Sequence, residues 1–188
     1  MSGTLNNASL KTGRSFDLGK MNLQQLWVAY LTYPTILLYF ALVAASFIGV
    51  CLFFAGWTAT LLTALAVIVV YPLAWYLLHR YVLHGHLLYK NKWTSSLWKR
   101  IHFDHHQDPH LLDVLFGSPA TTLPTIILIT APIGYLIGGI GAAFTGVCTG
   151  ITITCIYEFV HCIQHLNYKR SEERRVGQEG RTRWSPVD

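Results

Sequence analysis

Two long runs without a charged residue constrain this chain more than any other feature. No Lys, Arg, Asp or Glu stands between Met21 and His79, and a second charge-free run covers residues 114–157. A helix that crosses a bilayer needs about 20 apolar residues, so each run is long enough for two such helices. The stretch AGWTAT predicts a turn in the first run, and GYLIGGIGAAF interrupts the second. The sequence therefore predicts an all-α integral membrane protein with four transmembrane helices in two hairpins.

The positions of the basic residues predict how these helices are oriented. Some twenty polar residues precede the first span, which argues against a secretory signal peptide. Up to residue 169, the basic residues lie in the N-terminal arm, between the hairpins or at the end of the last span: Lys11, Arg14, Lys20, Arg80, Lys90, Lys92, Lys99, Arg100 and Lys169. The turns expected on the other side carry no charge, so the N-terminus and the basic segments are predicted to be cytoplasmic. The net charge of +5 thus reflects membrane topology, and no nucleic-acid partner is expected.

Seven of the nine histidines form three groups that this topology brings to one membrane face. His102, His105 and His106 stand at i, i+3 and i+4, and His161 and His165 at i, i+4, so each set shares a helix face and can bind metal. His79 and His84 are the other two residues, and they do not share a face of an ideal α-helix, because five positions correspond to a rotation of about 140°. His86 would face the same way as His79, and spacing alone does not choose between the two partners. The groups predict a histidine-rich cytoplasmic metal face.

Other interpretations of the histidines and cysteines compete with a metal site. A single histidine at an interface is usually a structural residue, but ionisable side chains at membrane depth are costly and those retained are usually functional. A proton relay, or a non-enzymatic protein that binds or transports metal, is the alternative. Against these, the histidines lie at the ends of the spans, and the inner halves offer no carboxylate to continue a path. The four cysteines, Cys51, Cys148, Cys155 and Cys162, form no CxxC pair and are predicted to be small apolar residues.

The order HRYVLH, HFDHH and HCIQH resembles the fatty acid hydroxylase and sterol desaturase superfamily of membrane di-iron oxygenases, over roughly residues 24–169. The resemblance implies His84 rather than His86 as the partner of His79. It implies two iron ions, with zinc possible in the isolated protein, and seven ligands: His79, His84, His102, His105, His106, His161 and His165. The implied activity is hydroxylation of a fatty acyl or related lipid with O₂ and electrons from a separate donor protein. Sterol or carotenoid oxidation or desaturation is the alternative within the superfamily.

A single acidic residue lies near the last histidine group. Glu158 precedes His161 by three residues and His165 by seven, so all three project from nearly the same helical face. We expect its carboxylate to accept a hydrogen bond from a ligand's other ring nitrogen, which would fix the tautomer. The alternative is a polar residue that marks where the helix meets water.

Two further groups of residues are predicted to be structural. Aromatic residues near the expected interfaces should anchor the spans: Trp27, Tyr30, Tyr33, Trp75, Tyr76, Tyr81 and Trp93. Glycines of the second hairpin should allow close helix packing: Gly138, Gly139, Gly141, Gly146 and Gly150.

The last nineteen residues differ from the rest of the chain. Residues 1–169 are predicted to form one membrane-embedded domain, whereas residues 170–188 resemble the translated read-through of a sequencing adapter and are expected to form no domain. The superfamily has a further HxxHH-type box after the HxxxH box, and no histidine follows His165. The resemblance therefore implies a domain that is incomplete at its C-terminus, with little or no catalytic activity in this form.

Overall fold

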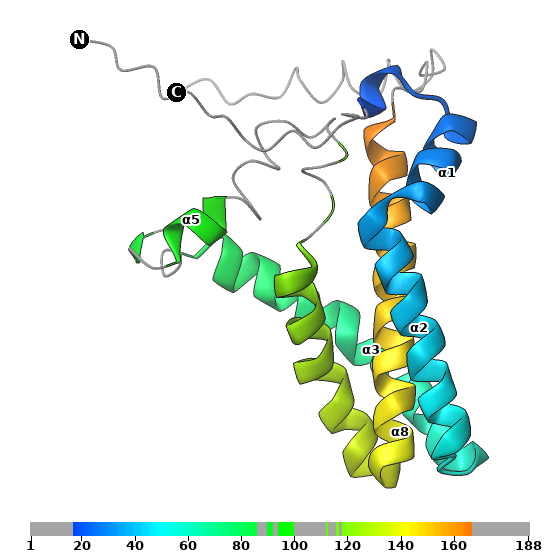
Figure 1. The fold of residues 1–188 in the computed structure, drawn as a ribbon. Coiled ribbons are helices and arrows are strands. Elements are labelled where there is room, and N and C mark those ends of the chain that lie inside the picture. The colour runs from blue at the N-terminus through cyan, green and yellow to red at the C-terminus, as the bar shows by residue number, and fades with distance from the viewer. Residues whose placement is uncertain are drawn as a thin grey trace, which may run out of the picture.

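Every secondary-structure element in the part of the chain that the structure describes is a helix. This structure is a computed structural model, and it describes residues 17–85, 90–91, 94–99, 112, 116 and 118–166. The elements in chain order (Figure 1) are η1 (Leu18–Lys20), α1 (Leu23–Thr32), α2 (Pro34–Leu52), α3 (Trp57–Leu77), η2 (Leu78–Leu83), α5 (Ser95–Trp98) and α8 (Pro119–His165). The all-α prediction is confirmed for these residues.

Three helices are long and apolar enough to cross a membrane. They are Pro34–Leu52, the continuous helix Trp57–Leu83, and Pro119–His165. The turn was expected at AGWTAT, residues 55–60. It lies earlier, at residues 53–56, because α2 ends at Leu52 and α3 begins at Trp57. Gly56, with a φ of 86°, supplies the backbone conformation that precedes α3. The helices agree with the predicted membrane protein.

Local sequence explains where the first helices begin. Asn22 and Gln25 form a capping box at the start of α1, in which each side chain accepts a hydrogen bond from the other residue's backbone amide, at 2.8 and 2.9 Å. Tyr33 is extended because a residue before proline is disfavoured in a helix, and Pro34 then occupies the first turn of α2. The chain therefore bends between α1 and α2.

The 47 residues of α8 contain a break at its two adjacent glycines. Gly138 and Gly139 have non-helical dihedral angles, and Gly139 has a φ of 68°. The chain reverses there, so residues 119–137 and 140–165 run in opposite directions (Figure 1). A Cβ atom at Gly134 would lie 2.1 Å from the carbonyl oxygen of Ala142, and one at Gly146 would lie 2.4 Å from that of Thr130. Glycine thus allows the two halves of α8 to pack closely.

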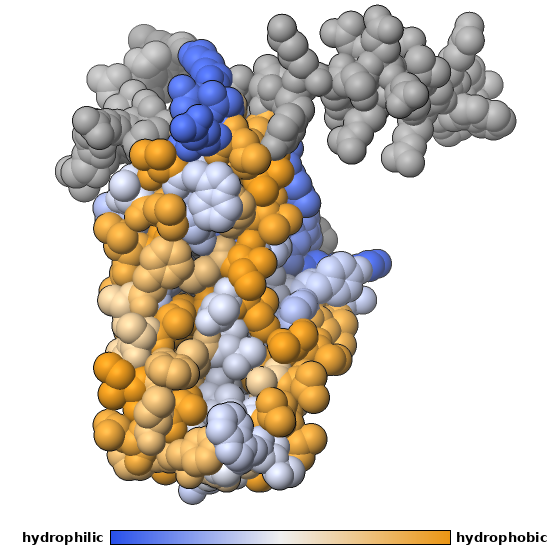
Figure 2. All heavy atoms as spheres, turned by 90° about the vertical axis from the view of Figure 1, so that its right-hand side faces the viewer, coloured by the Kyte–Doolittle hydropathy of each residue, from blue (hydrophilic) through white to orange (hydrophobic). Residues whose placement is uncertain are grey.

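The core lies where α8 packs against α2 and α3. It contains buried aliphatic and aromatic residues from all three helices, including Ile36, Tyr39, Val67, Tyr71, Ile126 and Ile151. The outward surfaces are also apolar: Leu136 is 85% exposed and Leu128 is 74% exposed. Figure 2 shows hydrophobic side chains over most of the visible helical surface. Such a surface matches the hydrocarbon of a bilayer rather than water.

Candidate metal site and the adjoining cleft

The first histidine pair depends on a change of helix type at the end of α3. Residues Leu78–Leu83 form a π-helix, and the backbone amide of His84 donates to the carbonyl of His79, five residues earlier, at 3.1 Å. In a π-helix residues five apart lie on the same face, unlike in an α-helix. The Nε2 atoms of His79 and His84 are 3.2 Å apart. At the end of this segment, the Trp98 indole of α5 donates to the carbonyl of Leu83 at 2.6 Å.

The second histidine pair lies at the C-terminal end of α8. His161 and His165 are one α-helical turn apart, and their Nε2 atoms are 3.3 Å apart. Cys162, between them, is buried against the neighbouring helices rather than turned with the two rings. The two imidazole rings therefore lie on the same face of the helix, as their four-residue spacing predicted.

Both pairs have the spacing of two ligands on one metal ion. Imidazole nitrogens about 2.1 Å from a metal are about 3.0 Å apart at an angle of about 90° and about 3.4 Å apart at about 109°. The observed separations of 3.2 and 3.3 Å fall between these values. Imidazole is a suitable ligand for iron, zinc and copper, so the donor set fits the predicted iron without choosing it over the others.

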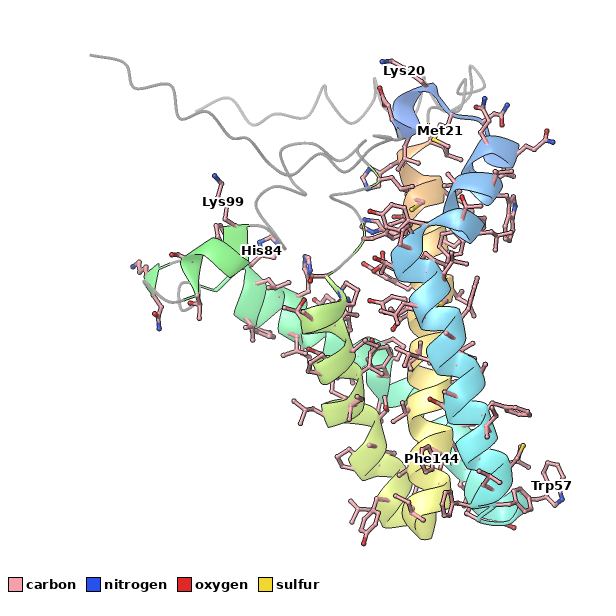
Figure 3. All side chains as sticks on the ribbon, viewed as in Figure 1. Lys20, Met21, Trp57, His84, Lys99 and Phe144 are labelled. Carbon is pink, nitrogen blue, oxygen red and sulfur yellow. The ribbon has the colours of Figure 1, made fainter. Side chains whose placement is uncertain are left out.

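The two pairs do not meet in one cluster within the described residues. Figure 3 places His84 on the far side of the molecule from α1, whereas the C-terminal end of α8 lies beside α1. No group of three or more His, Cys, Asp or Glu side chains in the described ranges could hold a metal ion. The central group, His102, His105 and His106, lies outside these ranges, as do His86 and His110. The seven-ligand site stays a prediction.

A cleft beside His79 separates α3 from the second half of α8. Its volume is about 260 Å³, and one side consists of Tyr71, Pro72, Trp75 and Tyr76 of α3 together with His79 of η2. The α8 side consists of Ile153, Thr154, Tyr157 and Glu158. The Tyr71 and Thr154 hydroxyl oxygens are hydrogen-bonded across the two helices at 2.8 Å. The cleft therefore runs from this bridge to a predicted metal ligand.

Glu158 lies in the cleft wall and is only 5% exposed. It lines the cleft on the side opposite His79, a residue of the other histidine pair. Its predicted hydrogen bond to a ring nitrogen of His161 or His165 stays a prediction. A second cavity of about 180 Å³ lies on another side of His79, where Thr121, Thr122 and Thr125 line it. His79 thus borders space on two sides.

Two of the aromatic residues that were predicted to anchor the spans make further contacts that the sequence did not indicate. Tyr30 is buried, and its hydroxyl donates to the carbonyl of Cys155 at 2.6 Å. Burial raises the pKa of this hydroxyl above its ordinary value. Trp75 lines both cavities beside His79. The spacing of Tyr71, Trp75 and His79 at four-residue intervals could have indicated this position, since such residues share a helix face.

Comparison with known proteins identifies the family. No curated protein and no solved structure matches the chain. A fatty acid hydroxylase family model matches residues 64–183, which is more than half of the chain and includes both histidine pairs. The chain therefore belongs to the fatty acid hydroxylase family, within the superfamily that the order of its histidine groups predicted.

Proposed function

We propose that the protein is an iron- and O₂-dependent oxygenase that hydroxylates a fatty acyl or related lipid, with electrons from a separate donor protein. The observation that carries this proposal is the geometry of two histidine pairs, with Nε2 separations of 3.2 and 3.3 Å, in a chain of the fatty acid hydroxylase family. Hydroxylases of other lipids, sterols included, and desaturases share the superfamily resemblance. A lipid substrate also agrees with the exposed apolar residues next to those that line the cleft, such as Leu73 and Ile156.

The residues of the chain have separate tasks in this proposal. His79, His84, His161 and His165 would hold two iron ions together with His102, His105 and His106. Bound iron would supply the redox chemistry that activates O₂ for attack on an unactivated C–H bond. The aromatic wall of the cleft binds and orients the lipid beside His79, and excludes water from this part of the site.

The proposed topology has four spans with the histidines at the cytoplasmic side. Residues 119–137 of α8 would extend about 28 Å as a helix, which approaches the thickness of the hydrocarbon core, and residues 140–165 are longer. Lys20, Arg80 and Lys99 belong to the segments that flank the histidine-bearing ends, whereas the break at Gly138 and the turn before Trp57 carry no charge. This distribution supports a cytoplasmic metal face.

The test combines metal content with the source of the product oxygen. The chain with its own residues 170–188 is compared with a version in which this segment is replaced by the corresponding segment of another family member. Each is purified from iron-supplemented cells, then supplied with a reductant, lipid and ¹⁸O₂. We expect bound iron and ¹⁸O-labelled hydroxylated lipid from the version with the replaced segment, and little or no product from the chain with its own residues 170–188. Adding His79→Ala or His161→Ala to the version with the replaced segment should remove both iron and product.

A matched control distinguishes ligand loss from general damage. Cys162 lies next to His161 but is buried in the helix contacts, so Cys162→Ala should retain iron and product. Hydroxylated lipid formed without bound metal, or unaffected by both histidine substitutions, would contradict the proposal. Iron-free protein that carries zinc or copper ions across liposome membranes would instead support a transporter.

A further inference from the structure

Arg80 carries a positive charge at the end of the apolar part of α3. This helix has 21 residues and is about 32 Å long, close to the hydrocarbon thickness of about 30 Å, and Arg80 follows its last residue by three positions. The Arg80 side chain is exposed, and so are Leu73 and Leu77 on the preceding turns. Arg80 therefore lies where the apolar outer surface of the helix meets the level of the lipid head groups.

Two tyrosine rings hold the guanidinium group of Arg80. The group donates a hydrogen bond to the Tyr76 hydroxyl, and its central carbon lies 5.9 Å from the centroid of the Tyr76 ring and 5.6 Å from that of the Tyr81 ring. Both distances are within the range of about 6 Å for cation–π contacts. Both rings are themselves exposed. These contacts restrict the arginine side chain and so reduce the entropy that it would lose on binding a ligand.

The charge of Arg80 is not balanced by a carboxylate. Among the described residues Arg80 forms no ion pair, whereas the exposed Lys20 pairs with Asp17 at 3.0 Å. A guanidinium group has five N–H donors, so most of them remain after the hydrogen bond to Tyr76, and the Tyr76 hydroxyl can still donate its own hydrogen. Paired N–H donors of arginine match two oxygens of one phosphate group. The donor set therefore fits a phosphate anion.

We propose that Arg80, Tyr76 and Tyr81 bind the phosphate group of an anionic phospholipid of the surrounding bilayer. The phosphate lies against the guanidinium group, the Tyr76 hydroxyl donates to a phosphate oxygen, and the acyl chains extend along Leu77 and Leu73. These exposed leucines favour a lipid over an acidic protein segment, because acyl chains cover them and a polar segment does not. A zwitterionic head group binds less tightly, since Arg80 repels its cationic part. The site is independent of bound metal and of the proposed oxygenase activity.

Equilibrium binding of two phospholipids that differ only in the head group tests the proposal. Radiolabelled phosphatidylglycerol and phosphatidylcholine with identical acyl chains are bound to the purified full chain in neutral-detergent micelles at low ionic strength. We expect phosphatidylglycerol to bind about fivefold more tightly, the factor expected for one basic residue at a membrane surface. Arg80→Gln should bring the ratio of the two affinities close to one.

Lys20→Gln is the matched control. It also removes one exposed positive charge, and Figure 3 shows Lys20 at the same end of the bundle as His84 and Lys99. Because Lys20 already pairs with Asp17, this substitution should leave the affinity ratio unchanged. An equal loss of preference in Lys20→Gln and Arg80→Gln would show general attraction between charges and would overturn the proposed site.

Further variants and a competitor distinguish a phosphate site on the lipid surface from other arrangements. Arg80→Lys keeps the charge but not the paired N–H groups, so the preference should fall to about twofold. Tyr76→Phe should weaken phosphatidylglycerol binding because it removes one donor. Glycerophosphoglycerol, the head group without acyl chains, and polyglutamate should not displace the bound lipid at millimolar concentration.

Each of the opposite results would overturn the inference. These are equal binding of both lipids by the parent, a preference that survives Arg80→Gln, a full preference in Arg80→Lys, unchanged binding in Tyr76→Phe, and displacement by either water-soluble competitor. The substituted side chains are exposed, so the packing of the helices should not change, and thermal unfolding of each variant checks this. If a variant unfolds, the affinity ratio of the parent and the competition experiment still decide.

Discussion

At the scale of single residues, the type of helix decides which histidines can meet. The five-residue interval between His79 and His84 leaves the rings about 140° apart on an α-helix. The π-helix Leu78–Leu83 instead brings the two Nε2 atoms to 3.2 Å, while the four-residue interval of His161 and His165 needs only an α-helix. The five-residue and four-residue histidine spacings therefore need different backbone hydrogen bonding, π-helical and α-helical. Both bring the two ring nitrogens of a pair to nearly the same separation.

The hydrogen bond of the Tyr30 hydroxyl should make part of the folding stability depend on pH. This hydroxyl holds α1 to α8 through the Cys155 carbonyl, so Tyr30→Phe should lower the free energy of unfolding by about 0.5–1.5 kcal/mol at neutral pH. The raised pKa means that the folded protein favours the neutral hydroxyl. This contribution is complete below about pH 10, the ordinary tyrosine pKa, and is lost as the pH rises above it.

Unfolding in detergent, measured from neutral to strongly alkaline pH, checks this prediction. The difference between the parent and Tyr30→Phe should shrink above about pH 10. Tyr81→Phe is the control, because the Tyr81 side chain is exposed and should contribute little. Equal stability of the parent and Tyr30→Phe at neutral pH, or a difference that widens in alkali, would contradict the assigned hydrogen bond.

At the scale of helices, the glycines of α8 have two different roles. Gly139 reverses the chain through its positive φ, and a Cβ atom there would meet no other atom within 4 Å. Gly141 has the opposite constraint, since its Cβ would lie 1.6 Å from the backbone carbonyl oxygen of Phe53. The close packing predicted for all five glycines is thus confirmed for Gly141 but wrong for Gly139, where backbone conformation is the reason.

Alanine substitutions should separate these two roles. Gly139→Ala should cost about 1–2 kcal/mol, the strain of a left-handed backbone conformation. Gly141→Ala should cost about 3 kcal/mol or more, because the turn between α2 and α3 must move to avoid the new methyl group. Thermal unfolding of both variants in the same detergent measures the difference. A Gly141→Ala protein as stable as Gly139→Ala would show that α8 does not approach Phe53 this closely.

At the scale of the whole molecule, the two ends of the helix bundle differ in chemistry. Figure 3 shows Lys20 and Lys99 at one end, with His84 nearest Lys99, and Trp57 and Phe144 at the other. The turn before Trp57 and the break at Gly138 lie together at the second end, since a Cβ atom at Gly138 would lie 2.6 Å from the Ala59 side chain. One end of the bundle is thus basic and histidine-rich, and the other is uncharged.

This polarity predicts the orientation in the membrane. In a background with Cys51, Cys148, Cys155 and Cys162 replaced, Thr58→Cys should react with a membrane-impermeant maleimide on intact cells. Lys20→Cys should react only after permeabilisation, because the positive-inside rule places that end in the cytoplasm. Both positions are exposed in the structure, so accessibility within the protein is not limiting. The reverse labelling pattern would contradict the proposed cytoplasmic metal face.

The sequence by itself determined the features that depend on local composition and spacing. Long apolar runs specify membrane helices because each residue contributes its own hydrophobicity. The adjacent glycines at 138 and 139 indicate the position of the break in α8. The order of the histidine groups was sufficient to predict the superfamily that the family match then showed. Helical periodicity also related His161 to His165, because residues four apart share a face in any α-helix.

Only the tertiary structure decided the features that depend on which helix surfaces meet. Tyr71 and Thr154 are 83 residues apart in the chain, and nothing in either local pattern predicts their hydrogen bond. The same contact between α3 and α8 places Glu158 in a cleft with His79, although its sequence neighbours are His161 and His165. The physical reason is that spacing along a helix fixes directions around one axis, whereas the partner of each face is selected by the packing of the whole bundle.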